Sequence, residues 1–119
     1  MTPQFQVIGI DDDDDTAQVG TQLAQLDLAP EAFKILLYHR PTGLEAAAEH
    51  GIDLMLTGHT HAGQIAPFNF VVKRVFAHIR GLITYGPTTL YVSPGTGTWG
   101  PVMRLGSRSE ITCFDLHME

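Results

Sequence analysis

Three histidines occupy positions in the sequence that predict a ligand-binding site. His59 and His61 are separated by one residue in Leu56-Thr-Gly-His-Thr-His-Ala-Gly-Gln64, and His39 follows an apolar run in Leu37-Tyr-His-Arg-Pro41. Neutral imidazole is a common ligand for Zn, Mn or Fe, and three imidazoles leave coordination positions open for water or substrate. We therefore predict that His39, His59 and His61 bind divalent metal.

Two short apolar runs lead into these histidines and predict the strands that position them. Phe33 to His39 is almost continuously apolar, as is typical of a strand covered on both faces, and Asp53 to Thr57 repeats the pattern. In open α/β sheets, ligands bind at the carboxyl ends of the strands. If these two strands are neighbours, the imidazoles meet at one edge, and Gly58 and Gly63 allow sharp turns around them.

The remaining pattern predicts an α/β fold. Phe5 to Ile10 has the composition of a strand, Thr16 to Leu26 that of an amphipathic helix, and Leu44 to His50 that of a short helix. The order strand, helix, strand, helix, strand implies right-handed crossovers and a parallel sheet. Gly/Pro clusters then separate runs that predict antiparallel strands, which are Leu82 to Tyr85, Thr89 to Ser93 and Glu110 to Leu116.

Length and composition limit the class of protein. The 119 residues (13.0 kDa) suit a single domain, residues 1–119, with one core. The formal charge is −6 and no basic patch dominates, so we expect no nucleic-acid partner. No uncharged apolar stretch is long enough to span a membrane, and the first residues lack the order of a signal peptide. These features favour a cytoplasmic or membrane-peripheral protein.

Three further side chains are candidates for substrate contact. Arg40 and Arg104 are candidates because a guanidinium group binds phosphate through two parallel hydrogen bonds. Trp99 stands among glycines and prolines, where it would either line a substrate groove or anchor the Gly-rich loop. That loop, residues 95–100, lacks the lysine and the following helix of a nucleotide-binding glycine loop.

These motifs together resemble the calcineurin-like metallophosphoesterases. Gly51 to Gln64 is similar to that family's Gly-His-x-His block, and Tyr38 to Pro41 is similar to the isolated-histidine block that precedes it. Further segments resemble one bacterial branch of the family, and they are Val7 to Asp12, Leu90 to Gly95, and Gly97 to Pro101 continuing through Arg104 to Thr112. The resemblance covers nearly the whole chain and implies the C-terminal half of the family's two-sheet sandwich.

The resemblance also implies an activity, the hydrolysis of phosphomonoester or phosphodiester bonds at a dinuclear metal site. His39 and His59 would bind one Mn, Fe or Zn ion, and His61 would bind the other. Two divalent ions about 3.5–4 Å apart activate a bridging water and neutralise the phosphoryl oxygens of the substrate. The family's Gly-Asp and Gly-Asn-His blocks do not occur here, and no Asp-x-His block precedes the histidine motifs.

Two other interpretations stay open. In the first, the chain is a catalytically incomplete metal-binding fragment whose sheet is completed by another chain, with self-association through exposed sheet edges. In the second, His39, His59 and His61 hold one zinc ion and the chain is a mononuclear hydrolase.

Three features outside the histidine motifs have ordinary structural interpretations. Asp11 to Asp15 lacks the spacing of a calcium loop and is interpreted as a solvated loop. Phe68 to Ile79 fits an amphipathic helix that packs on protein, although a membrane or lipid contact and a β-hairpin are alternatives. Cys113 lies in an apolar alternation and is expected to be buried in a strand.

Overall fold

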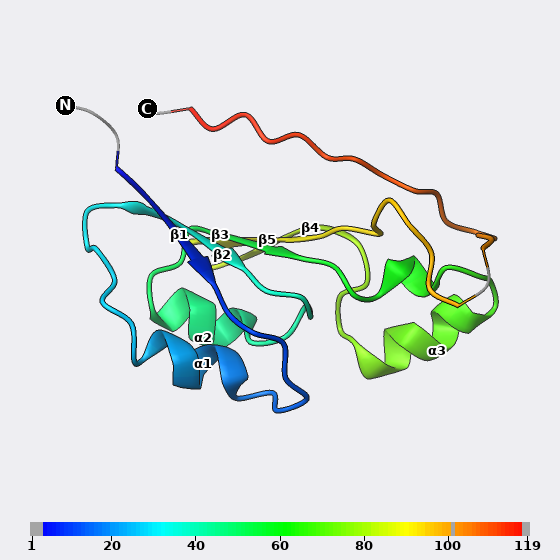
Figure 1. Cartoon of the computed structure of the whole chain (residues 1–119), viewed down its shortest axis with the longest axis horizontal. Helices are drawn as coiled ribbons and strands as arrows, with labels where there is room; N and C mark the ends of the chain where they lie inside the picture. The colour runs from blue at the N-terminus through cyan, green and yellow to red at the C-terminus, as the bar shows by residue number, and fades with distance from the viewer. Residues whose placement is uncertain (1–3, 101, 118–119) are drawn as a thin grey trace.

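The computed structural model describes residues 4–100 and 102–117, which form a mixed sheet with helices (Figure 1). The strand order is β1-β2-β3-β5-β4, with bounds β1 Phe5–Gly9, β2 Phe33–Leu37, β3 Leu54–Thr57, β4 Gly81–Tyr85 and β5 Thr88–Val92. β1, β2, β3 and β5 are parallel neighbours, and β4 is antiparallel to β5 at one edge. The predicted α/β class and its parallel βαβαβ portion are confirmed.

Two helices, α1 (Gln18–Leu23) and α2 (Leu44–Glu49), cover one face of the sheet (Figure 1). Val19 and Leu23 of α1 lie on one side of that helix and form a buried cluster with Leu36 of β2 and Met55 of β3. Burying a side chain of this size stabilises the fold by about 1.5–3 kcal/mol. Helix α1 is shorter than the predicted range Thr16 to Leu26, and turns continue it to Leu26.

The predicted antiparallel pair after the parallel strands is confirmed, and β5 has a second partner that the sequence pattern did not specify. β4 and β5 form the expected antiparallel hairpin, joined at Gly86 and Pro87, but β5 pairs with β3 in parallel. β4 runs antiparallel to β3, so the connection between them begins and ends at the same end of the strands, and it contains the 3₁₀ turn η1 (His61–Gly63) and helix α3 (Phe68–Val75). Strand-forming composition does not reveal direction, so the sequence pattern left this pairing open.

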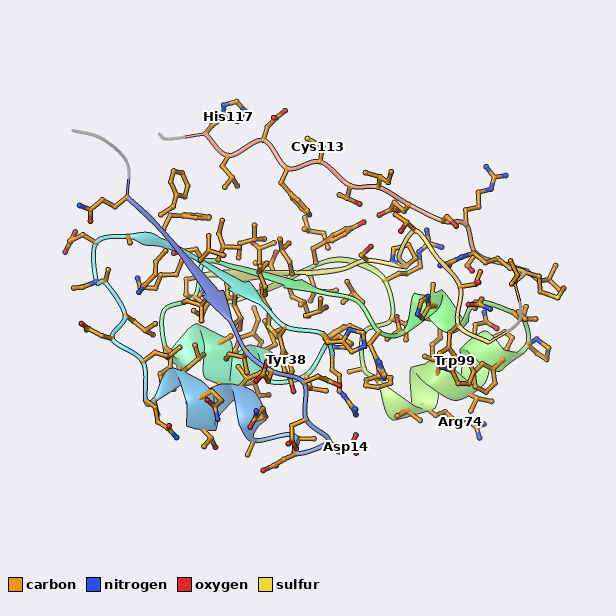
Figure 2. All side chains as sticks on the ribbon, viewed as in Figure 1. Asp14, Tyr38, Arg74, Trp99, Cys113 and His117 are labelled. Carbon is orange, nitrogen blue, oxygen red and sulfur yellow. The ribbon has the colours of Figure 1, made fainter. Side chains whose placement is uncertain are left out.

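The predicted strand Glu110 to Leu116 is wrong. This segment is extended but makes no strand pairing, and it runs across the sheet face opposite α1 and α2 (Figure 1). Its contact with the sheet is through side chains, since the Phe114 ring lies 5.1 Å from the Tyr91 ring and Thr112 Oγ1 lies 2.8 Å from the Tyr91 hydroxyl. A segment on a face has no strand edge to pair with, and Cys113 is therefore exposed rather than buried (Figure 2).

Helix α3 confirms the helical prediction for residues 68–75 and excludes the hairpin alternative there. The helix ends at Phe76, which adopts an extended conformation. No side chain of α3 is buried, because the helix rests on η1 mainly through the backbone of Asn69 beside Gly63. Helix α3 and η1 lie beyond the strand ends rather than over the sheet (Figure 1). Across the described ranges, no helix has the length and apolar character needed to cross a bilayer.

Candidate metal centre

The carboxyl ends of β2 and β3 bring two of the predicted ligands together. His39 follows β2 after Tyr38, and His59 follows β3 after Gly58. The loops are tied by a hydrogen bond from the Gly58 amide to the His39 carbonyl oxygen at 2.9 Å. His39 Nε2 lies 2.9 Å from His59 Nδ1, and the ring centroids are 4.7 Å apart. The parallel pairing of neighbouring strands therefore produces the predicted convergence for His39 and His59.

The turn that carries His59 and His61 has an unusual backbone. His59, His61, Ala62 and Gln64 all have positive φ values, between 48° and 68°. Such conformations are uncommon for residues with a Cβ atom and tend to occur at functional sites. Buried Thr60 holds the turn, because its hydroxyl donates to the Ile79 carbonyl oxygen at 2.6 Å and accepts from the Ala62 amide.

His61 lies close enough to His39 and His59 for charge interactions with them, and it also lies beside Arg104. Its Nδ1 is buried and has no hydrogen-bond partner in the described part of the chain. Gly95, which has a positive φ of 80°, lies beside both His61 and Arg104. Within residues 4–100 and 102–117, no three His, Cys, Asp or Glu side chains converge closely enough to hold one metal ion. The ligand roles of the three histidines stay predictions.

Electrostatics favours the neutral form of two imidazoles. Burial lowers the pKa of His59, and the proximity of His39 and Arg40 lowers it further. Burial also lowers the pKa of His61, with a second contribution from the positive charge of Arg104. Metal ions bind the neutral imidazole through its lone pair. The lowered pKa values of His59 and His61 therefore favour the protonation state that a metal ligand requires.

Arg104 lies beside His61, and its guanidinium group is hydrogen-bonded to backbone carbonyl oxygens. Its guanidinium donates to the carbonyl oxygens of Pro94 and Gly97, each at 2.6 Å, and to that of His61 at 3.2 Å. A further bond reaches Ser107 Oγ at 3.3 Å. Arg104 thus connects the His61 turn to the Gly-rich loop, and the predicted phosphate contact remains untested.

Arg40 is paired with the acidic run. Its Nε lies 2.8 Å from Asp12 Oδ1, and its Nη1 contacts Asp14 Oδ1. These contacts lower the pKa of the Asp12 carboxyl, with the Arg40 hydrogen bond as the main cause. The acidic run is thus a loop with two carboxylates committed to Arg40, a partnership that sequence reasoning missed because it depends on β1 and β2 ending side by side.

Gln64 is a site residue that the motif analysis did not single out. Its side-chain amide donates to the Trp99 carbonyl oxygen at 2.8 Å, and its Oε1 accepts from the Trp99 amide. Trp99 is thus anchored through its backbone, whereas its indole ring is exposed (Figure 2). The structure is compatible with both interpretations of Trp99: its backbone anchors the Gly-rich loop, and its exposed ring is accessible to a substrate. In the sequence, Gln64 could have been noticed only because it is the last residue of the segment that contains Gly-His-x-His.

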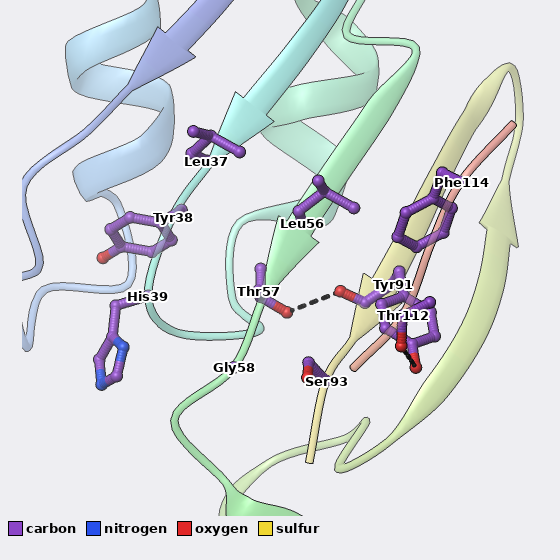
Figure 3. A pocket seen from close by; sticks show the side chains of 10 residues that line it. All are labelled: Leu37, Tyr38, His39, Leu56, Thr57, Gly58, Tyr91, Ser93, Thr112 and Phe114. Carbon is purple, nitrogen blue, oxygen red and sulfur yellow. Dashed lines mark hydrogen bonds between the residues drawn. The ribbon is translucent and has the colours of Figure 1, made fainter. Parts of the chain in front are cut away.

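An open groove of about 460 Å³ runs from His39 to the C-terminal segment (Figure 3). Thr57 and Ser93 line its centre, and Tyr91 and Phe114 line the far side. The C-terminal segment also carries Asp115-Leu-His117, which has Asp-x-His spacing. Asp115 and His117 are both exposed, and no group of three potential ligands that includes them occurs in the described ranges.

Comparison with known proteins identifies similar chains by sequence. An uncharacterized metallophosphoesterase of Helicobacter pylori is 48% identical over 84 residues, covering 69% of this chain and 23% of that protein. A transmembrane protein with metallophosphoesterase domain from Bos taurus is 47% identical over 71% of this chain and 20% of its own length. Phosphodiesterase YaeI of Escherichia coli is 33% identical over 70% of this chain and 32% of its own length.

The chain therefore spans about a fifth to a third of the length of these relatives. No family model matches the chain, and no solved structure matches it.

Proposed function

Because this chain belongs to the metallophosphoesterase family, we propose that it forms the histidine-bearing portion of a divalent-metal-dependent phosphoesterase with a dinuclear site. In this proposal His39 and His59 bind one ion and His61 binds the other. The substrate is a phosphodiester or phosphomonoester, and the relative named as a phosphodiesterase favours the former. The observation that carries the proposal is the approach of His39 Nε2 to His59 Nδ1 at 2.9 Å.

The separation between these two nitrogens fits a shared metal ion. Nitrogens that each bind one Zn ion at about 2.0–2.1 Å lie roughly 3 Å apart when they occupy adjacent coordination positions. The Nδ1 atom of His61, which is buried and has no hydrogen-bond partner among the described residues, supports a second ligand position. Bound divalent ions would activate water and neutralise the negative charge of the phosphoryl group.

The chain's own residues would shape this site. His39, His59 and His61 supply neutral ligands, and Arg104 holds the His61 turn against the Gly-rich loop. Gln64 fixes the backbone of Trp99, whose exposed ring faces the solvent from which substrate arrives. Arg40 is engaged by Asp12 and Asp14, so phosphate contact by Arg40 would require those carboxylates to release it.

A second candidate function has its own supporting observation. Because no third ligand joins the His39–His59 pair in the described residues, the chain is alternatively a metal-binding module that gains activity only with further ligands from another polypeptide. A lone zinc ion held by all three histidines is less favoured, since no three potential ligands converge on one point in the described residues.

Metal content and turnover separate these functions. The purified chain is dialysed, its bound metal is measured, and hydrolysis of a chromogenic phosphodiester is followed with added Mn²⁺. Two ions with turnover support the complete site, whereas one ion without turnover supports the module. His59→Ala should lose metal, and His50→Gln should retain it because His50 caps α2 through its bond to Ala46. If the wild-type chain binds no metal, or if His59→Ala retains it fully, both functions are excluded.

A further inference from the structure

The charges of this protein are strongly segregated along the chain. Residues 54–109 contain five cationic side chains and no Asp or Glu, whereas the rest of the chain carries two cations and all thirteen acids. The five cations are Lys73, Arg74, Arg80, Arg104 and Arg108. The overall charge of −6 therefore conceals a segment of +5, and this segment contains η1, α3 and the Gly-rich loop.

Four of these cations are exposed and available to a partner. Lys73, Arg74, Arg80 and Arg108 are all on the surface, and none of them forms an ion pair with a described residue. Arg80 and Arg108 also line one cavity together with Ser107, Ser109 and Glu110, and the Glu110 carboxylate accepts a hydrogen bond from Thr112 Oγ1. Exposed guanidinium groups beside hydroxyl groups match the chemistry of phosphate oxygens. This part of the surface is therefore complementary to an anionic partner that carries phosphate.

The same segment exposes large apolar side chains. On α3, Phe68, Val71 and Val75 lie at positions i, i+3 and i+7 and share one side of the helix, and all three are exposed. Lys73 and Arg74 lie off that side by helical spacing. Beyond α3, further apolar side chains are exposed on the loop that follows β5, and they are Trp99, Val102, Met103 and Leu105.

We propose that α3 and its own cations dock this protein on the surface of an anionic phospholipid membrane. Phe68, Val71 and Val75 would enter the boundary between headgroups and acyl chains, while Lys73 and Arg74 contact lipid phosphates. Arg80 and Arg108 add to the positive charge of the same segment. An amphipathic helix with an apolar side and basic flanks lies in the plane of a membrane interface in this way. The proposal is independent of the phosphoesterase chemistry.

Charge distinguishes this surface from the other apolar region of the molecule. The sheet face opposite α1 and α2 exposes Phe5, Val7 and Leu37, but these strands belong to the part of the chain that carries the acids. The cation of those two strands, Lys34, is buried, whereas Lys73 and Arg74 are exposed on α3 and attract an anionic membrane. We therefore assign lipid contact to the α3 surface and not to the sheet face.

Vesicle co-sedimentation tests the proposal with the whole chain. The protein should bind vesicles of phosphatidylcholine and phosphatidylglycerol in equal parts, should bind phosphatidylcholine alone much less, and should be released by high salt. The variant Arg74→Gln should weaken binding about fivefold. Soluble inorganic phosphate should not compete at equal phosphate concentration; if it abolishes binding without vesicle disruption, the surface is a phosphate site and the membrane proposal is overturned.

A matched pair of valines assigns the contact to α3. Val75 is 71% exposed on α3 and Val7 is 61% exposed on the sheet face, so serine at either position leaves the core intact. Val75→Ser should weaken vesicle binding by roughly tenfold, because a buried valine methyl pair is lost from the interface. Val7→Ser should bind like wild type. Equal loss in both variants, no vesicle binding by wild type, or self-association that only Val75→Ser abolishes would each overturn the proposal.

Discussion

The sheet with α1 and α2 is held together differently from the loops beyond the strand ends. In the first region, side chains such as Leu36, Met55 and Leu90 are completely buried against the helices. In the second region, which contains η1, α3 and the Gly-rich loop, polar contacts by Arg104, Gln64 and Thr60 connect the segments. Burial is cumulative and non-directional, whereas a hydrogen bond fixes particular atoms.

This difference implies a division of roles. The sheet and its two helices contain the buried core cluster, and the sheet places His39 and His59 at adjacent strand ends. The polar contacts decide where the His61 turn and the Gly-rich loop lie relative to that pair. Substitutions in the first region should lower stability and metal binding together, and substitutions in the second should change metal binding more than stability.

The largest effect is expected from Leu36→Ala in the centre of the sheet. Leu36 is fully buried on β2 between two parallel neighbours, so truncation leaves a cavity. The free energy of unfolding should fall by about 2–5 kcal/mol, as measured by urea denaturation followed by circular dichroism. A loss smaller than that of Leu82→Ala, whose side chain is exposed on β4, would contradict the assigned core.

A pair of glycines tests how η1 holds α3. Both Gly63 and Gly51 have positive φ, so alanine costs about 1–2 kcal/mol at either position. At Gly63 an added Cβ would also lie 2.1 Å from Asn69 Cα, whereas nothing lies within 4 Å at Gly51. Gly63→Ala should therefore cost roughly 1–3 kcal/mol more.

Amide hydrogen exchange is the measurement that distinguishes the two glycine variants. Gly63→Ala should raise exchange rates in α3, because the helix must move away from η1 to accommodate the new methyl group. Gly51→Ala should leave α3 unchanged. Similar exchange in both variants would show that the contact between Gly63 and Asn69 does not position the helix.

The sequence predicted the sheet region well because its determinants are local. Phe33 to Leu37 and Leu54 to Thr57 are short apolar runs, and such runs beside helical patterns are typical of buried parallel strands. The place of His39 and His59 followed from the strand ends. The strand prediction for the C-terminal segment was wrong because strand pairing is not a local property. The alternation around Cys113 does not reveal whether the edge of another strand is available for pairing.

The loop region was less predictable because its contacts join residues far apart in the sequence. Arg104 is separated by 43 residues from His61, whose carbonyl oxygen it binds. Nothing in the neighbourhood of an arginine shows whether it will bind a phosphate or the carbonyl oxygens of another loop. The exposure of α3 could not be predicted either, because an amphipathic pattern shows which side of a helix is apolar but not whether another part of the protein covers that side.

A smaller effect is expected from Arg104→Lys, which keeps the charge but loses the forked geometry. Lysine cannot reach Pro94, Gly97 and His61 together, so the free energy of unfolding should fall by about 1–2 kcal/mol. Metal affinity should fall further than this stability loss accounts for, as measured by metal titration. Arg108→Lys is the matched control, because Arg108 is exposed and binds no described residue. Equal metal affinity in both variants would assign Arg104 a purely structural role.

The smallest effect on stability is expected at the Arg40 and Asp12 pair, because both side chains are partly exposed. Arg40 lowers the pKa of Asp12, so the pair contributes stability above the ordinary carboxyl pKa of about 3.9 and loses it as pH falls through the lowered value. In Arg40→Gln the Asp12 pKa should rise and this acid-dependent loss should disappear, as followed by carboxyl-carbon NMR titration. Arg108→Gln should leave the Asp12 pKa unchanged. An Asp12 pKa that is the same in Arg40→Gln and wild type would show that the pair does not form in solution, and Arg40 would then be free to contact phosphate at the strand ends.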